Sequence, residues 1–235
     1  MNAVSIMAHQ DDEMSCLGTM LKCRARGDRL SFITVTDGSK GFVQRPGIAR
    51  EEAARIRHEE MAGLCNSIGA GFINLGEPDE FLYDTPELRL RLTEAIRATG
   101  AELIFTHFQE DYNLDHTTAA ALVRQCAMHA CLPVLPTESA PLAAHPAVFL
   151  IRPHGPFSFP ASHFVDISGQ EREKVSLLQS HGSQEVALRS ALGTGFDELC
   201  AVPDAYWGSL VGCAYAEPFA PMPARGAVKP HSVLP

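Results

Sequence analysis

Short apolar runs alternate with amphipathic stretches over the first two thirds of the chain. The apolar runs, rich in β-branched and aromatic residues, predict strands at 3–8, 30–35, 72–75, 102–106, 147–151 and 163–167. Apolar residues at helical spacing between them predict helices at 13–26, 47–69, 85–99, 117–131 and 168–180. Strands that alternate with helices in this way are expected to pair in parallel, through right-handed crossovers.

This order predicts an α/β fold: a Rossmann-like, doubly wound, mostly parallel sheet with helices on both faces. The 235 residues are enough to fill one core, so we expect a single domain at 1–217. From Pro218 onward the chain holds five prolines and few apolar residues. We expect an irregular Pro-rich tail at 218–235, which packs on the surface or on a second subunit of a homo-oligomer.

Composition narrows the function classes. Hydrophobic residues make up 46% and charged residues 20%, an ordinary globular balance. The net charge of −9 argues against nucleic acid or an anionic membrane as a partner. No apolar run approaches the roughly 20 residues of a membrane span, and the first residues do not form a signal peptide. The seven cysteines include no C-x-x-C pair, so we expect reduced, mostly buried thiols in a cytoplasmic protein.

Two polar clusters follow predicted strands. The stretch "MAHQDDEMSC" (7–16) places an imidazole and three carboxylates directly after the first strand. The stretch "THFQEDYNLDHTTAA" (106–120) begins at the end of the fourth strand. It contains an Asp-His pair, Asp115-His116, just before the next predicted helix. Ligands of doubly wound sheets bind beyond the carboxyl ends of the strands. We therefore expect both clusters to lie at one edge of the sheet.

The residue types in these clusters suit a divalent cation. His9 and Asp12 are three positions apart and share a face if the chain turns helical there. His116 is the best candidate for a third protein ligand, with Asp115 beside it to orient a ligand or the loop. Zinc accepts this mixture of nitrogen and oxygen, although other divalent metals do so too. Asp11, between the first two ligands, is placed to act as a general base on water.

Other interpretations remain open at this point. Acidic residues after a strand often do no more than cap a turn. No G-x-G-x-x-G follows the first strand, which disfavours a dinucleotide site, and no G-x-S-x-G is present, which disfavours a serine hydrolase. The stretch "RPHGPFSFP" (152–160) either places His154 and two phenylalanines at the mouth of a pocket, where aromatic faces suit sugar rings, or is a rigid surface loop.

At these motifs the chain resembles the PIG-L/LmbE-like N-deacetylases. Ala8 to Glu13 matches their A-H-P-D-D-E motif, and Asp115-His116 matches the D-H that ends their histidine-rich loop. Weaker matches follow in order: "DGSKG" (37–41), Arg57-x-x-Glu60, Asp79 after "LGEP", "FVDIS" (164–168), "HGSQ" (181–184) and "AEPF" (216–219).

The resemblance implies a zinc enzyme that removes acyl groups from the nitrogen of amino sugars and related glycoconjugates. It implies that His9, Asp12 and His116 bind zinc and that Asp11 is the catalytic base. It also implies that Arg57 and Asp79 grip the hydroxyl groups of the sugar.

Two positions depart from the family pattern. Gln10 stands where the family has proline. Asn113 stands where the family often has a histidine, three residues before the metal-binding one. Asparagine can donate a hydrogen bond to an oxyanion but cannot deliver a proton. Proton return then falls to Asp11, or to His181 if its loop folds over the site; a histidine that stabilises a helix C-terminus is an equal alternative for His181.

The function expected from these residues is metal-dependent hydrolysis of an N-acyl group, usually acetyl, from an amino sugar. An amidase acting on a thiol-linked sugar conjugate, or a deacylase that tailors a natural product, would keep the same metal site. A Rossmann-like module that binds a metal or nucleotide without turnover is the alternative of another class.

Overall fold

The structure, a computed structural model, describes residues 1–223 and 234; residues 224–233 and 235 lie outside the described part. The strands are β1 (Asn2–Met7), β2 (Arg29–Thr36), β3 (Gly71–Glu77), β4 (Leu103–Thr106), β5 (Ala147–Ile151), β6 (His163–Asp166) and β7 (Ala216–Pro221). The helices are η1 (Asp12–Ser15), α1 (Leu17–Ala25), α2 (Arg50–Ile68), α3 (Pro86–Thr99), α4 (Leu114–His129), α5 (Glu171–Leu178), α6 (Gly182–Leu192) and α7 (Phe196–Val211).

The strands form one sheet in the order β3-β2-β1-β4-β5-β7-β6. Strands β1 to β5 pair in parallel, whereas β7 runs antiparallel to both of its neighbours. The chain reverses its direction of travel across the sheet between β1 and β4, which is where doubly wound folds bind ligands. The predicted fold class, a mostly parallel α/β sheet in a single domain, is confirmed.

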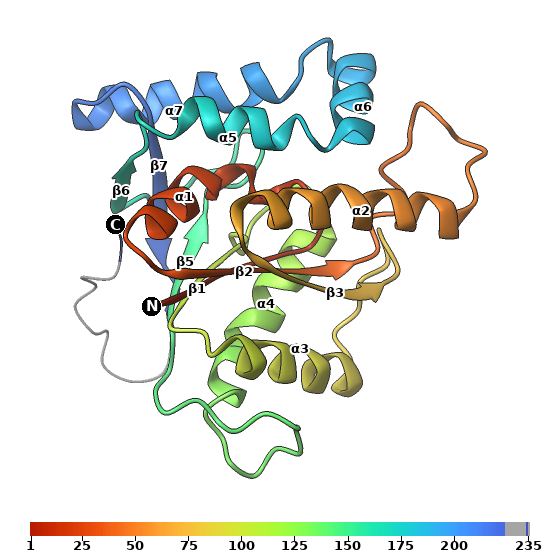
Figure 1. Cartoon of the computed structure of the whole chain (residues 1–235), viewed down its shortest axis with the longest axis vertical. Helices are drawn as coiled ribbons and strands as arrows, with labels where there is room; N and C mark the ends of the chain where they lie inside the picture. Colours follow the sequence, from red (N-terminus) through yellow and green to blue (C-terminus); the bar gives the residue numbers. More distant parts are fainter. Residues whose placement is uncertain (224–233, 235) are drawn as a thin grey trace.

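Helices cover both faces of the sheet (Figure 1). Helices α3 and α4 lie on one face, and α1, α2 and α5 to α7 lie on the other. Strand β1 shows why: Ala3 and Met7 belong to the apolar core on the α1 side, whereas Val4 and Ile6 belong to the core on the α3 side. Successive side chains of a strand point to opposite faces, so the continuous apolar run of β1 fills both cores.

The ends of α3 and the start of α4 follow the chain's capping signals. The Thr85 side chain accepts a hydrogen bond from the Leu88 amide at 3.2 Å, and Pro86 is the first residue of α3. Gly100 ends the same helix with a φ of 61°, a conformation that glycine adopts without steric cost. Helix α4 begins three residues earlier than predicted because Asn113 caps it.

The last third of the chain contains more helices and strands than its sequence predicts. Helices α6 and α7 and strand β7 were not predicted. The tail predicted from 218 starts later, because residues 218–221 belong to β7, which pairs with β5 and β6. The rest of that tail lies largely outside the described residues.

The cysteine prediction agrees with the structure. All seven cysteines are free, five of them are buried, and the other two are partly exposed. Within residues 1–223 and 234, no helix combines the length and apolar character needed to cross a bilayer.

Candidate metal and active site

The polar clusters meet at the carboxyl edge of the parallel strands. The loops after β1, β2, β3 and β4 line a cavity of about 950 Å³, together with α6, α7 and residues 152–155. Both predicted clusters contribute to it: His9, Asp11 and Asp12 from the first, Asn113 and His116 from the second. The expectation that the two clusters share one edge of the sheet is therefore correct.

His9, Asp12 and His116 form a compact triangle although the two histidines are 107 positions apart. The Nδ1 atom of His9 lies 3.3 Å from Nε2 of His116 and 3.1 Å from Oδ2 of Asp12. The Nε2 atom of His116 lies 3.3 Å from Oδ1 of Asp12. Four ligands at about 2.0–2.1 Å around a tetrahedral zinc ion lie roughly 3.3 Å from one another. The donor set and its spacing thus fit a metal of this kind.

The remaining ring nitrogens of both histidines face carboxylates. The Nε2 atom of His9 lies 3.0 Å from Oδ1 of Asp79 and 3.4 Å from Oδ2 of Asp115. The Nδ1 atom of His116 lies 3.1 Å from Oδ1 of Asp111. Metal-binding histidines in proteins usually have a carboxylate next to their other ring nitrogen, which favours one tautomer and one ring orientation. His9, Asp79 and Asp115 also lie close enough together to hold a cation. The contacts above favour a different role for Asp79 and Asp115, which is to support the His9 ring.

Asp79 and Asp115 are fixed by the backbone of the neighbouring loop. Asp115 accepts hydrogen bonds from the amides of Glu80 (2.8 Å) and Leu82 (3.1 Å). Asp79 accepts one from the amide of Lys40 at 2.6 Å. The two carboxylates therefore join the loops after β2 and β3 to the imidazole of His9.

The charges of the triangle are strongly coupled. Burial lowers the pKa of His116, but Asp12 and Asp111 outweigh it and raise the pKa to about 9. Burial raises the pKa of Asp12, but His116, His107 and His9 outweigh it and hold the pKa well below its usual range. The protein thus favours positive charge next to the Asp12 carboxylate. A divalent cation bound there supplies that charge in place of protons on the histidines.

His107, the residue directly after β4, supports this cluster and was not predicted. Its ring stacks on His116 with centroids 4.1 Å apart. The Ala8 amide donates to its Nε2 atom at 2.9 Å, so that nitrogen carries no proton. Burial and the neighbouring His116 lower the pKa of His107 to about 4, which keeps the ring neutral. Its place in the histidine-containing cluster after β4 was the available signal.

Asp11 has an unusual backbone conformation and a partly buried side chain. Its φ of 114° is rare for a residue other than glycine. Its amide donates to Oε2 of Glu13 at 2.9 Å, and Nη2 of Arg57 lies 3.2 Å from its Oδ1. Burial raises the pKa of Asp11 to about 6, against the opposing charge of Arg57.

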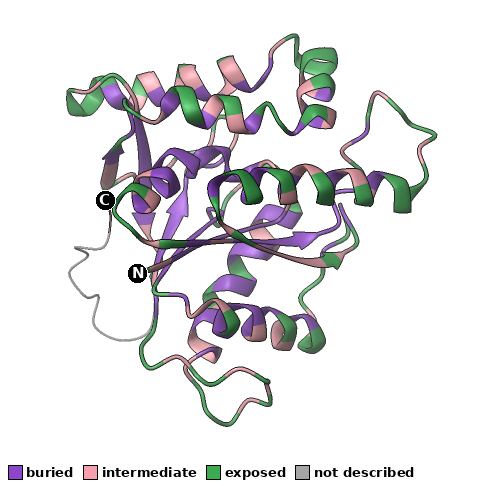
Figure 2. Cartoon of the chain, in the orientation of Figure 1, coloured by how far each residue is buried: buried purple, intermediate pink, exposed green. Residues whose placement is uncertain are grey.

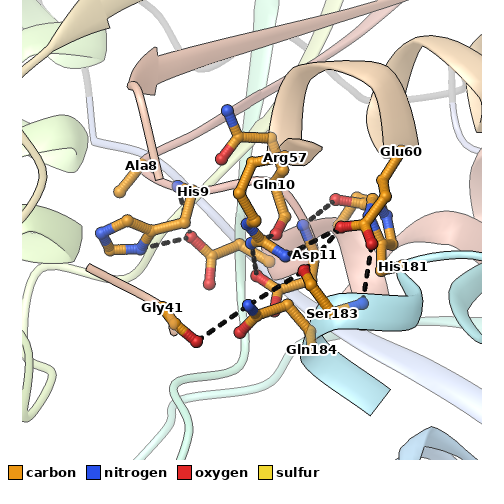
Figure 3. Close-up of polar contacts among 12 residues, drawn as sticks. Ala8, His9, Gln10, Asp11, Gly41, Arg57, Glu60, His181, Ser183 and Gln184 are labelled. Atoms are coloured by element: carbon orange, nitrogen blue, oxygen red, sulfur yellow. Dashed lines mark hydrogen bonds and ion pairs between the residues drawn. The ribbon is translucent and has the colours of Figure 1, made fainter. Parts of the chain in front are cut away.

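Further contacts connect Asp11 to the start of α6 (Figure 3). Arg57 donates to the Gln10 carbonyl, and its Nη1 lies 3.9 Å from Oε2 of Glu60. Glu60 accepts from the amide and the hydroxyl of Ser183, both at 2.7 Å. The turn at Gly38 lies against the Gln10 side chain, so closely that a Cβ added to Gly38 would collide with it. The φ of 65° at Gly38 also favours glycine.

Two residues predicted to act on the substrate have other partners. His181 is completely buried and is not among the described residues that line the cavity; its Nε2 lies 2.8 Å from Oε1 of Glu13. It follows the end of α5, where its amide donates to the Leu178 carbonyl at 3.0 Å, and it precedes α6; its imidazole, however, pairs with Glu13. Asn113 lines the cavity, but its Oδ1 accepts from the Asp115 amide at 2.7 Å and its Nδ2 donates to Glu80 at 3.2 Å.

His154 does reach the cavity. Its Nε2 lies 3.3 Å from Oγ of Ser15, and its ring stands edge-on to His116 with centroids 5.9 Å apart. Burial and the nearby charge of Arg152 lower the pKa of His154 to about 3, so the ring is neutral. His154 thus lies at a pocket, as one interpretation of its loop had it, but Phe157 and Phe159 are not among the described residues that line the cavity.

Comparisons with known proteins place these features in context. A family model described as "PIG-L: GlcNAc-PI de-N-acetylase" matches residues 4–127, more than half of the chain. The conserved protein TT1542 from Thermus thermophilus is 28% identical, with a TM-score of 0.80 and 97% of each chain covered.

Two further solved structures share the fold at lower identity. The N,N'-diacetylchitobiose deacetylase from Pyrococcus horikoshii is 20% identical, with a TM-score of 0.80; 94% of this chain and 83% of that chain are covered. GalB, the 4-carboxy-2-hydroxymuconate hydratase from Pseudomonas putida, is 19% identical, also with a TM-score of 0.80; 98% of this chain and 100% of that chain are covered. At these identities the likeness establishes the fold alone.

Proposed function

The chain belongs to the PIG-L family of de-N-acetylases, and from that premise we propose that it is a zinc-dependent hydrolase that removes an acetyl group from the nitrogen of an amino sugar or glycoconjugate. The deacetylase of the same fold from Pyrococcus horikoshii is described as acting on N,N'-diacetylchitobiose, an acetylated amino sugar. The observation that carries the proposal is the convergence of His9, Asp12 and His116 beside the partly buried carboxylate of Asp11.

In this proposal His9, Asp12 and His116 would hold the metal. A bound zinc ion supplies Lewis acidity, which lowers the pKa of a water molecule and polarises the acyl carbonyl. Asp79 and Asp115 orient the ring of His9, and Asp111 orients the ring of His116. This differs from the role of Asp79 implied by the resemblance, because its carboxylate already contacts His9 and Lys40.

Asp11 acts as the general base. Its side chain lines the cavity, and a pKa of about 6 leaves it ionised at neutral pH while it can still hold a proton during the reaction. It accepts a proton from water as the water oxygen attacks the acyl carbon. The carbon–nitrogen bond then breaks, the acetyl group leaves as acetate, and the proton passes from Asp11 to the amine. Arg57 holds Asp11 in position through their 3.2 Å contact.

His154 takes the part that the resemblance gave to residue 113. A neutral imidazole can donate a ring N–H to a developing oxyanion, and His154 faces the cavity beside His116. Asn113 is less suited, since both ends of its amide have partners in the protein. Tyr112, which is exposed and lines the cavity, presents an aromatic face of the kind that packs on a sugar ring.

The direct test is the variant Asp11→Asn, with Asp84→Asn as a matched control at an exposed carboxylate. We expect Asp11→Asn to retain zinc and to release amine from N-acetylglucosamine or N,N'-diacetylchitobiose about 10²- to 10⁴-fold more slowly than the wild type. The control should match the wild type in both measurements. Full turnover in Asp11→Asn with metal bound would remove Asp11 from the mechanism. Bound zinc with no amine released by the wild type would favour a binding module.

A further inference from the structure

Glu80 has a backbone conformation that its residue type disfavours. It is the third residue of a turn after β3, in which the Phe81 amide donates to the Pro78 carbonyl at 3.2 Å. Its φ is 64°, in the left-handed region, where turns favour glycine or asparagine at this position. The connection from β3 to α3 is largely exposed, as is Glu80 itself (Figure 2), so burial in the core does not explain a glutamate here.

The carboxylate of Asp115 holds this turn in place. Its Oδ2 accepts the Glu80 amide at 2.8 Å and its Oδ1 accepts the Leu82 amide at 3.1 Å. The same Oδ2 lies 3.4 Å from Nε2 of His9. The backbone of Glu80 is therefore fixed relative to the metal cluster, in a conformation that costs free energy. Strain of this kind persists where the surrounding structure imposes it, and it is common at functional sites.

Glu80 lines the cavity that contains the metal cluster, together with Tyr112 and Asn113 of the segment between β4 and α4. Its Oε1 accepts a hydrogen bond from Nδ2 of Asn113 at 3.2 Å. Among the residues that the structure describes, none forms a hydrogen bond or an ion pair with its Oε2. The contact with Asn113 is exposed to solvent, and such a bond is a weak reason to keep a strained residue. The carboxylate thus has one oxygen left to accept from a ligand.

Resting on the proposed function, we propose that Glu80 determines specificity by accepting a hydrogen bond from a hydroxyl group of the substrate's sugar ring. A carboxylate accepts hydrogen bonds, and sugar hydroxyls donate them. Tyr112, exposed in the same cavity, offers an aromatic face to the ring. The resemblance gave this role to Asp79, but the Asp79 carboxylate faces His9 and the Lys40 amide. Glu80 is the next residue and is free to take the role.

Two variants separate the carboxylate from the strain. Glu80→Ala and Glu80→Gly both remove the carboxylate, but only glycine adopts the left-handed conformation without steric cost. A hydrogen bond from a hydroxyl to a carboxylate contributes about 10- to 100-fold to kcat/KM, so both variants should lose that much on N-acetylglucosamine. Glu80→Gly should nevertheless melt about 1–4 °C higher than Glu80→Ala. Wild-type kcat/KM in either variant would overturn the proposal.

The control is Glu87→Ala, at an exposed glutamate of α3 that is not among the described residues lining the cavity. It should keep the kcat/KM of the wild type. An equal loss in Glu87→Ala would show that the effect of the Glu80 variants is one of surface charge, and would count against the proposal.

Deoxy substrates identify the hydrogen bond itself. The 3-deoxy, 4-deoxy and 6-deoxy derivatives of N-acetylglucosamine each lack one hydroxyl group. We expect the wild type to hydrolyse at least one of them about 10- to 100-fold less efficiently than the parent compound. Glu80→Ala should treat that derivative and the parent alike, because the partner of the missing hydroxyl is already gone. If the variant instead lowers kcat/KM for every compound by the same factor, Glu80 has a structural role and the proposal is wrong.

Binding measured without turnover separates this proposal from the proposed function. Calorimetric titration of Asp11→Asn, with and without Glu80→Ala, reports the affinity for N-acetylglucosamine and for the affected deoxy derivative. An affinity that Glu80→Ala lowers about tenfold for the parent alone supports Glu80, even if no amine is ever released. Equal affinities in all combinations, or no measurable binding, would contradict it. Amine release that is insensitive to Glu80 supports the hydrolase and contradicts the role of Glu80.

Discussion

The Oε1 atom of Glu13 lies 2.8 Å from Nε2 of His181, and both side chains are almost completely buried. The other oxygen of Glu13 accepts the amide of Asp11. The carboxylate of Glu13 thus joins the start of α6 to the residue proposed as the general base. His181 is not among the described residues that line the cavity. It acts on the site by holding Glu13, which in turn holds the backbone of Asp11.

Replacing His181 should affect turnover more than substrate affinity. His181→Leu removes the partner of Oε1 of Glu13 in a buried site, which costs about 1–3 kcal/mol in stability, and frees the Asp11 turn to shift. We expect kcat to fall on the order of 10- to 100-fold with KM nearly unchanged, in kinetics run below the melting temperature of the variant. His181→Gln keeps a donor for Glu13 and should recover most of kcat. Equal loss in both variants would indicate that the imidazole itself takes part.

Removing one ligand of the triangle should release the metal. We expect His116→Ala to bind zinc at least tenfold more weakly than the wild type, as measured by competition with a chromogenic chelator. Activity of the wild type should disappear on chelation and return when zinc is added. His58→Ala, at an exposed histidine of α2, is the control and should keep its metal. Undiminished zinc affinity in His116→Ala would place the cation elsewhere, for example at His9, Asp79 and Asp115.

Asn113 should prove to be a helix cap. Because its Oδ1 accepts the Asp115 amide at the start of α4, Asn113→Ala should lower the free energy of unfolding by about 1 kcal/mol. Asn113→Asp retains the cap and should be nearly as stable as the wild type in urea unfolding. Both variants should retain substantial activity. A loss of turnover in a stable Asn113→Asp protein would return Asn113 to the catalytic role implied by its place in the family motif.

Glu171 should make stability depend on pH. Burial raises its pKa to about 7 from an ordinary 4.5, despite the nearby charge of Lys174; Asp204 and Glu217 raise it further. The folded protein therefore holds a proton that the unfolded chain has released, so this contribution to stability is complete below pH 4.5 and is lost as the pH rises through 7. We expect Glu171→Gln to flatten the decline in unfolding free energy between about pH 5 and 8, and to exceed the wild type at about pH 8 by on the order of 1 kcal/mol. Glu173→Gln, at an exposed neighbour, should follow the wild-type curve.

The sequence was sufficient to predict the elements that carry strong local signals. Strand β5 and the ends of α3 followed from apolar runs, a threonine cap and a terminal glycine. The position of the site followed from a rule of topology, since parallel strands end at one edge and two polar clusters followed such strands. These predictions needed only neighbours in sequence and the handedness of crossovers.

The parts that were missed depend on contacts between distant residues. Nothing in the local pattern distinguishes His181 as a buried partner of Glu13 from a histidine at a pocket, because the answer depends on how α6 packs on α2 and η1. Strand β7 contains two prolines, at 218 and 221, and such segments are usually predicted as loops; here it pairs with β5 on one side and β6 on the other, which no local pattern could indicate. The support of His9 by Asp79 likewise requires two loops to be placed in space.

The position of β7 has a consequence for biosynthesis. This strand follows helices α1 to α7 and strands β1 to β6 in the chain, yet it is inserted between β5 and β6. Its Glu217 accepts the amides of Gly18 and Thr19 at the start of α1, only a few residues after His9 and Asp12, the proposed metal ligands. During translation the segment with His9 and Asp12 is made before every strand that flanks β7, and Glu217 is made after all of them. The start of α1 therefore gains its contacts with Glu217 only after the rest of the sheet has been synthesised.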